Sequence, residues 1–224
     1  MTETNRASLF QAIKKGDRQA VEDLLASGAE LASARDESGV SAVLTAIYYG
    51  QPAIADLLIA GRERLNASLD LFEASAAGRA DRVEDLLRAA PDRVNDFAPD
   101  GFQALGLAAF FGHPQVARVL LEHGADPNTP SHNKMRVPPL NSAAAGGHLE
   151  VARLLLDYGA NPNALQGEGF APLHSAAQNG QAELVELLLR RGAGPQVRTS
   201  GGKTPWDLAQ EAGHLELKPL LALS

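Results

Sequence analysis

Three histidines recur at equivalent places in the chain, and histidine is the commonest side-chain ligand of transition metals. His113, His148 and His214 each follow a glycine directly, and they are separated by 35 and 66 residues. Packed helices lie about 8–10 Å apart, whereas a Zn–N bond is about 2.0–2.1 Å long. Histidines that are one structural unit apart therefore cannot share an ion. We predict no metal site and interpret these histidines as turn residues that form local hydrogen bonds.

The sequence contains no recognised catalytic motif. It has no cysteine, which excludes a thiolate zinc site and a cysteine nucleophile. The patterns G-x-S-x-G and H-E-x-x-H are absent, and the GGKT at 201–204 lacks the upstream glycine and preceding strand of a phosphate-binding loop. Acidic pairs such as Glu22-Asp23 and Glu84-Asp85 fall on polar helix faces, where we expect them to be solvated. We therefore predict no catalytic residue, no nucleotide or other cofactor, and no enzyme activity.

The composition narrows the range of partners. The net charge is −7, with 27 acidic and 20 basic residues. Because sequence-independent binding to nucleic acid depends on neutralising phosphates with Lys and Arg, we expect neither nucleic acid nor an anionic membrane as a partner. The start MTETNRASLF lacks the features of a signal peptide, and no run approaches the length of a membrane-spanning helix. These features favour a cytoplasmic monomer, and the 15 arginines against five lysines favour a GC-rich, bacterial genome.

A glycine between two short apolar stretches recurs along the chain. The intervals between successive glycines are 34, 28, 34, 35, 33 and 33 residues. A period of this length indicates a stacked repeat array, which acts through an extended surface rather than around a single enclosed core. The glycines of the series are Gly16, Gly50, Gly78, Gly112, Gly147, Gly180 and Gly213.

The segment 169–192 indicates what one unit contains. Pro172 stands at the start of a predicted helix, where its missing N–H costs no hydrogen bond. Gly180 ends that helix, because glycine readily adopts the left-handed conformation of a helix C-terminus. A second, leucine-rich helix is predicted over about 182–190, and Gly192 ends it before a polar loop. The repeated pattern is therefore helix, tight turn, helix and exposed loop.

These repeated pieces resemble the ankyrin-repeat family, whose pattern runs G-x-T-P-L-H-x-A-A, G-H at the turn, V-x-x-L-L and G-A-D-x-N. The chain reads GFAPLHSAAQNGQAELVELLLRRGA at 169–193, GHPQVARVLLEHGADPN at 112–128 and GGHLEVARLLLDYGANPN at 146–163. The resemblance covers about residues 8–222 and implies one all-α domain over 1–224, a solenoid of about seven helix-turn-helix units with β-hairpin fingers along one edge. It also implies a structural hydrogen-bonding role for His174. The expected units are 5–35 (the N-terminal cap), 36–66, 67–98, 99–130, 131–164, 165–198 and 199–224 (the C-terminal cap).

Three places depart from the regular pattern. Only Ala67 and Ser68 stand where seven residues are usual, so the finger between the second and third units should be absent. Nine residues separate Asn128 from Pro138, so that finger should be longer than usual. Pro219 comes early in the last predicted helix, which should therefore be short or distorted.

Six of the eleven aromatic residues occupy positions that, in the family, lie on the concave face. Rings of the second and fourth units should flank an alanine floor in the third, where no finger covers them. Such apolar clusters mark interaction sites, and aromatic side chains are typical anchors. The alternative is that the rings pack inward, although their adjacency in two pairs favours one exposed ring per pair. The candidate partner-binding residues are the rings Tyr48, Tyr49, Phe102, Phe110, Phe111 and Phe170, the floor Ala76 and Ala77, and the long-finger residues Lys134, Met135 and Arg136.

The residues and the resemblance together predict non-catalytic binding of a protein or peptide through the concave groove and the fingers. The basic residues of the long finger would meet an acidic or mixed partner, unless that finger is simply a solvated loop tip. Two alternatives stay open: a regulatory or docking subunit of an enzyme, and a structural spacer. Exposed rings would argue against the spacer, which has no use for them.

Overall fold

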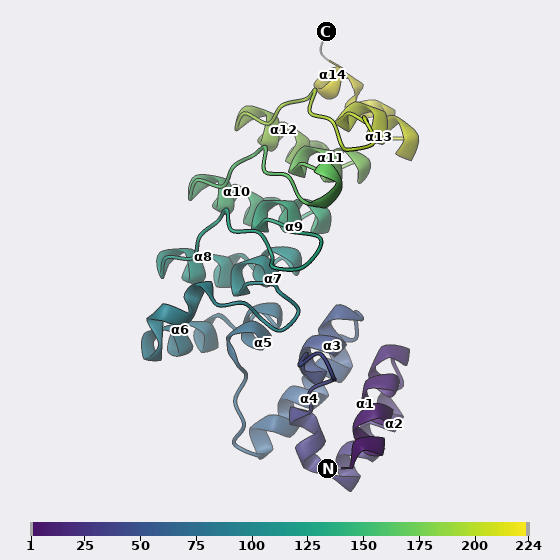
Figure 1. Cartoon of the computed structure of the whole chain (residues 1–224), viewed down its shortest axis with the longest axis vertical. Coiled ribbons are helices and arrows are strands. Elements are labelled where there is room, and N and C mark those ends of the chain that lie inside the picture. Colours follow the sequence, from purple (N-terminus) through teal and green to yellow (C-terminus); the bar gives the residue numbers. More distant parts are fainter. Residues whose placement is uncertain (1, 223–224) are drawn as a thin grey trace.

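The computed structural model describes residues 2–222, and within them the chain is mostly helical (Figure 1). Successive helices form antiparallel pairs, and we number the pairs in chain order from α1/α2. The α-helices are α1 (Glu3–Lys15), α2 (Arg18–Ser27), α3 (Ala42–Tyr48), α4 (Pro52–Arg64), α5 (Leu71–Ala76), α6 (Ala80–Ala89), α7 (Ala104–Phe110), α8 (Pro114–Glu122), α9 (Pro139–Gly146), α10 (Leu149–Asp157), α11 (Pro172–Gln178), α12 (Ala182–Arg190), α13 (Pro205–Ala212) and α14 (Lys218–Leu221). Short 3-10 turns occupy Ala29–Ser33, Pro91–Asn95, Gly167–Gly169 and Leu215–Leu217.

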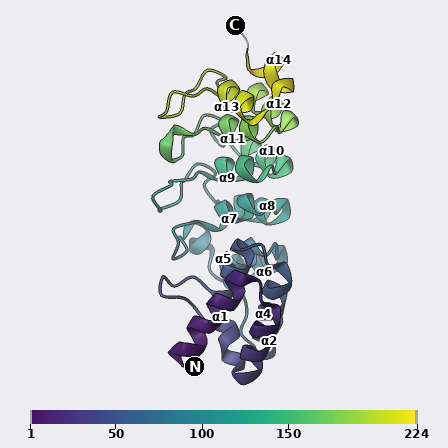
Figure 2. The same ribbon diagram turned by 90° about the vertical axis from the view of Figure 1, so that its right-hand side faces the viewer.

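The helices form two layers that run along the stack. Odd-numbered, inner helices pack against one another, and even-numbered, outer helices line the opposite side. The loops between pairs project along one edge, beyond the inner helices (Figure 2). The C-terminal ends of the inner helices and these loops therefore form one continuous face of the molecule.

The turn between the helices of a pair depends on glycine. Gly112 ends the turn after α7 with a φ of 73°, a conformation that other residues rarely adopt. A Cβ at this position would also lie 2.3 Å from Nδ1 of His148 in the next pair. The recurrent glycine thus provides both the backbone conformation and the space in which the next pair packs.

The core extends along the whole stack between the two layers. Leu120 of α8 and Leu155 of α10 are completely buried, and small residues such as Ala108 and Ala143 let the inner helices approach closely. Each pair buries its apolar surface against its neighbours, as expected of a repeat array.

The second helix of the last described pair is short. A 3-10 turn at Leu215–Leu217 leads into α14, which has only four residues and contains Pro219. The predicted short final helix is therefore confirmed. The predicted end of the last unit, at residue 224, lies outside the described residues.

The predicted β-hairpin fingers are only partly represented. Among residues 2–222 the loops contain two isolated antiparallel bridges, Arg35 with Ser41 and Phe97 with Gln103, and no β-strand. The connection between α4 and α5 does not project as a loop, in agreement with its short sequence. Turns and side-chain hydrogen bonds mainly hold the loops. They therefore contain less regular strand pairing than the family pattern implies.

Candidate protein-interaction surface

Two of the three turn histidines bond to the neighbouring pair rather than locally. Nε2 of His113 donates to the Ala76 carbonyl at 2.9 Å, and Nε2 of His148 donates to the Phe110 carbonyl at 2.9 Å. Each bond satisfies a carbonyl at the C-terminal end of the preceding inner helix, where no intrahelical donor is available. His214 instead lies 3.5 Å from the Glu216 carboxylate. Within residues 2–222, no three His, Cys, Asp or Glu side chains gather as a metal site.

His174 is a buried structural residue, as the sequence predicted. Its Nδ1 accepts a hydrogen bond from the Ala171 amide at 3.0 Å, which leaves Nε2 as the protonated nitrogen that donates to the Lys203 carbonyl at 3.2 Å. Burial lowers the pKa of His174, so the neutral ring is favoured. The side chain thereby links the start of α11 to the loop of the following pair.

Each adjacent aromatic pair has one well-exposed ring. Tyr49 is 51% exposed and Phe110 is 46% exposed, whereas Phe111 is half-buried and packs against the core. Tyr48 is intermediate between these extremes, at 36%. Neither ring pair is hidden in the interior, and exposed apolar side chains mark an interaction site where they form a contiguous patch.

The second and fourth helix pairs meet across the third through Tyr48. Its ring lies 5.8 Å from that of Phe111, between centroids, and its hydroxyl donates to the Asp100 carboxylate at 2.5 Å. Burial and this carboxylate both raise the pKa of Tyr48. Phe111 in turn meets Phe110 edge to face, with centroids 5.1 Å apart. The sequence placed these rings on two separate walls, but the structure brings them together.

The loops of the same two pairs also touch. A Cβ on Gly39 would lie 3.2 Å from Cβ of Pro99, so the loop 34–41 meets the loop 96–103 directly. Arg35 also bonds to Asp70 at 2.8 Å, which ties the first of these loops to the start of α5. We call this meeting of the second and fourth pairs, through Tyr48, Asp100, Gly39 and Pro99, the closure.

The two alanines predicted as the floor lie at the C-terminal end of α5. Ala76 is buried and Ala77 is half-buried. Together with Phe111 and the turn at Gly50 they line a pocket of about 280 Å³. The third pair therefore contributes small side chains to a pocket that Phe111 also lines.

The long loop presents a basic and apolar tip. Met135 is 58% exposed, and Lys134 and Arg136 beside it are exposed and make no ion pair within the described chain. Asn133 holds the loop in place, since its side chain donates to the Asp100 carbonyl at 3.2 Å and accepts from the Met135 amide at 3.1 Å. This tip is therefore a fixed feature.

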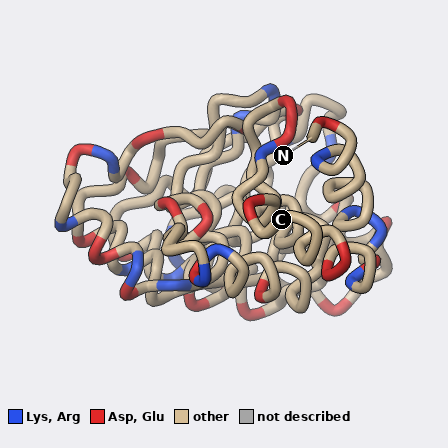
Figure 3. Tube along the Cα trace, turned by 90° about the horizontal axis from the view of Figure 1, so that it is seen from below, with Lys and Arg blue, Asp and Glu red and all other residues tan. Residues whose placement is uncertain are grey.

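The remaining predicted rings contribute less surface. Phe102 is half-buried and packs against the core, and Phe170 is half-buried beside the ring of His174. In the view of Figure 3, basic and acidic residues are interspersed over the molecule. The cations of the long loop are thus a local feature of an acidic protein.

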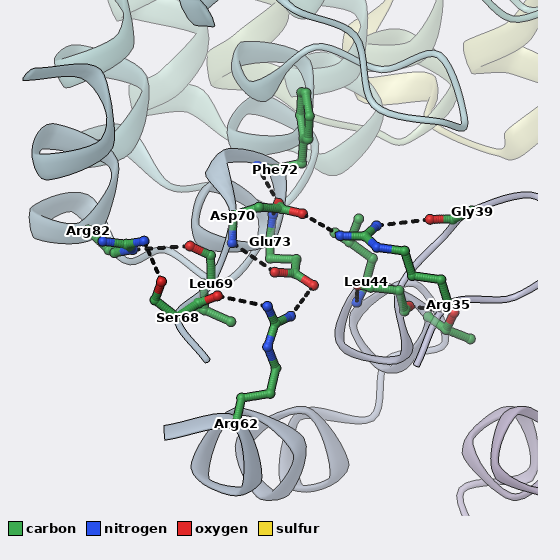
Figure 4. Close-up of polar contacts among 12 residues, drawn as sticks. Arg35, Gly39, Leu44, Arg62, Ser68, Leu69, Asp70, Phe72, Glu73 and Arg82 are labelled. Atoms are coloured by element: carbon green, nitrogen blue, oxygen red, sulfur yellow. Dashed lines mark hydrogen bonds and ion pairs between the residues drawn. The ribbon is translucent and has the colours of Figure 1, made fainter. Parts of the chain in front are cut away.

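A buried ion pair at the junction of the second and third pairs was missed by the sequence reasoning. Arg62 of α4 reaches Glu73 of α5, whose side chain is fully buried, and also donates to the Ser68 carbonyl at 2.7 Å (Figure 4). Glu73 also accepts from the Asp70 amide at 2.8 Å, which completes a capping box at the start of α5. The feature of the sequence that indicates this buried pair is a glutamate inside the otherwise apolar stretch LFEASAA.

The outer side of this junction is open. A cleft of about 550 Å³ lies between α4 and α6, lined by Ile59, Glu63, the connection 67–69, the first turn of α6 and Gln115. It adjoins the pocket of the alanine floor, with which it shares Ile59 and Arg79. The junction therefore closes on the loop side and opens on the outer side.

The paired helices and the glycine turns define a helical repeat protein. A family model described as ankyrin repeats (3 copies) matches residues 71–166, and one described as ankyrin repeats (many copies) matches residues 157–209. The chain belongs to the ankyrin-repeat family, whose repeats generally serve as non-catalytic protein-interaction modules.

Two curated proteins resemble parts of the chain. Protein VAPYRIN-LIKE of Medicago truncatula is 30% identical over 132 residues, which is 57% of this chain and 28% of that protein. Cyclin-dependent kinase inhibitor 2A of Monodelphis domestica is 36% identical over 70 residues, 30% of this chain and 39% of that protein. The matched region thus spans well under half of either relative. Within residues 2–222, no helix is both long and apolar enough to cross a membrane.

Proposed function

We propose that this chain binds a protein or peptide partner without catalysis, through the face formed by the inner-helix ends and the loops. The observation that carries the proposal is the exposure of Tyr49 and Phe110 on either side of the Tyr48–Phe111 contact. Aromatic anchors surrounded by smaller contacts are typical of binding hot spots. Ala76 and Ala77 would form the floor, and Phe102 and Phe170 would contribute at the margin.

The partner should combine apolar and acidic side chains. Lys14 of α1 lies 6.0 Å from the ring centroid of Tyr49, and Lys134 and Arg136 extend from the long loop. These cations make no ion pair within the described residues, and they occur on a protein of net charge −7. Carboxylates on the partner would therefore find one unpaired cation beside Tyr49 and two more on the long loop, which favours orientation and rate of association.

The rings alone support only modest affinity. Complete burial of one such side chain contributes about 1.5–3 kcal/mol, and association itself costs about 4–15 kcal/mol. Two exposed rings therefore contribute about 3–6 kcal/mol, which reaches only the lower end of that cost. Contacts from Met135, the loop cations and the half-buried rings must contribute to a stable complex.

A second candidate function is docking onto an enzyme. The similarity of a 70-residue segment to a cyclin-dependent kinase inhibitor favours it, since that relative's name describes action on a kinase. In this case the same surface would contact a catalytic partner and regulate it. The two candidates differ only in what the partner does.

Capture of partners from a native lysate, followed by calorimetry with the purified partner, tests the proposal. Tyr49→Ala with Phe110→Ala should weaken binding at least tenfold while the melting temperature changes little, because both rings are exposed. Tyr158→Ala is the matched control, since that tyrosine is 41% exposed at the far end of α10. Full binding by the double variant, or equal loss in the control, would exclude this surface as the site.

A further inference from the structure

We infer that the short connection between α4 and α5 builds the binding surface, by letting the second and fourth helix pairs meet across the third. This inference rests on the function proposed above, because it explains how rings from two non-adjacent pairs come to share one surface. The rings of Tyr48, Phe111 and Phe110 form a row of successive contacts, Tyr49 follows Tyr48 in the chain, and Lys14 lies beside the ring of Tyr49.

On the loop side of the junction, the second and fourth helix pairs are in contact. A loop of ordinary length before α5 would stand between the loops 34–41 and 96–103. Because it is missing, Gly39 and Pro99 are in contact, and Tyr48 reaches Asp100 directly. Tyr48 and Asp100 are 52 residues apart, so this contact spans a complete helix pair.

On the outer side of the junction, the second and third helix pairs are separated. Neighbouring outer helices pack against each other at α2/α4, α6/α8, α8/α10 and α10/α12, but α4 and α6 stand apart. The cleft of about 550 Å³ occupies the place where they would meet. The first two helix pairs form one block, and the pairs from the third onward form another. Bringing these two blocks together on the loop side separates them on the outer side, so the closure and the cleft are two results of one rotation.

A substitution inside α6 keeps the cleft open. Counted from the interhelical glycine, Arg82 occupies the position of the buried Val116 and Val151 in later outer helices. Arg82 instead donates to Ser68 Oγ at 2.7 Å and to the Leu69 carbonyl at 3.1 Å (Figure 4). The residue that would otherwise pack between outer helices thus holds the short connection.

The buried ion pair fixes the position of the two blocks. Arg62 joins the end of α4 to Glu73 and to the Ser68 carbonyl, while its Nε has no partner among the described residues. An ion pair that is removed from water requires its particular partner, unlike an apolar contact that can slide. The second pair is therefore held at one angle to the third.

Lengthening the connection tests the inference while every ring is retained. The variant receives the five residues 166–170 (QGEGF) inserted between Ala67 and Ser68. The matched control receives the same insertion between Gly201 and Gly202, in an exposed loop. Because the chain has no cysteine, spin labels can be attached at Ala53→Cys on α4 and Asp85→Cys on α6 without removing a native thiol.

Electron spin resonance then measures the distance between the α4 and α6 labels. The insertion should shorten it, since the blocks separate on the loop side and close on the outer side, and the control insertion should leave it unchanged. Labels at Arg118→Cys and Arg153→Cys, across the packed helices α8 and α10, should show no change in either protein. An unchanged α4–α6 distance in a folded insertion variant would overturn the inference.

A second variant covers the case in which the insertion does not fold. Arg82→Val restores the side chain found in later outer helices and should also shorten the α4–α6 distance. If it folds and the distance stays at the wild-type value, the inference is wrong. These distances need no partner, so they decide the inference separately from the proposed function, which the Tyr49 and Phe110 variants decide.

Discussion

Arg62 and Glu73 form an ion pair whose side chains are 10% and 0% exposed, at the junction where the outer helices α4 and α6 stand apart. Elsewhere in the described stack, pairs are joined mainly by leucine, valine and alanine. This junction combines a shortened connection, a polar contact and an open cleft. The change in geometry and the change in chemistry therefore coincide.

Removing one partner of this pair should destabilise the protein strongly. Arg62→Met leaves Glu73 buried without its cation, and an unpaired buried charge costs about 3–5 kcal/mol. Arg62→Met combined with Glu73→Leu should recover much of the loss, because no buried charge remains. Urea denaturation measures both. Arg190→Met, which breaks an exposed pair with Glu186, is the control and should change stability by less than about 1 kcal/mol. A similar effect of Arg62→Met and Arg190→Met would contradict the burial argument.

Leucines in the middle of the stack should be the most sensitive apolar positions. Leu120 and Leu155 are completely buried between inner and outer helices, and replacing either by alanine should cost about 2–5 kcal/mol. Leu165→Ala is the control, since that leucine is 52% exposed in a loop. Thermal unfolding of the three variants checks the order. If Leu165→Ala proves as damaging as the others, burial is not the deciding factor.

Acid should weaken the stack through its half-buried and buried histidines. Burial lowers the folded-state pKa of His113 and of His174 below the ordinary 6.5. As the pH falls through 6.5, the unfolded chain therefore binds protons that the folded chain does not, and stability decreases until the lowered pKa is reached. At pH above 6.5 this contribution is fully present.

Melting temperatures at pH 7.5 and 5.5 measure this effect. His113→Gln keeps a donor for the Ala76 carbonyl, as Gln51 and Gln181 occupy the same position in other pairs, and should show a smaller decrease on acidification. An equal decrease in the variant and the wild type would show that His113 takes no part.

The C-terminal end should open before the centre. The helix α14 has four residues and packs on one side only, so nearest-neighbour stabilisation is incomplete there. Amide hydrogen exchange should be fastest over α13 and α14, and slowest over α7 to α10. Protection over α13 equal to that over α8 would contradict a stack that frays from its ends.

The sequence by itself determined the repeat and, in the unit 169–192, where the helices begin and end. Glycines such as Gly112 and prolines such as Pro172 act through their own backbone conformations, so their effects can be predicted locally. The second helix of the sixth unit, predicted over about 182–190, is observed as Ala182–Arg190. The two-residue gap at Ala67 and Ser68 likewise predicted the absence of a projecting loop, because chain length limits reach.

Only the tertiary structure decided how the chain compensates for that gap. The resemblance to the family placed Tyr48 and Phe111 on the same face, but their contact depends on the angle between helix pairs, which no local preference specifies. The same angle brings Arg62 to Glu73 and separates α4 from α6. Such contacts arise from rigid blocks that rotate until their surfaces meet, so they depend on the whole packing rather than on neighbouring residues.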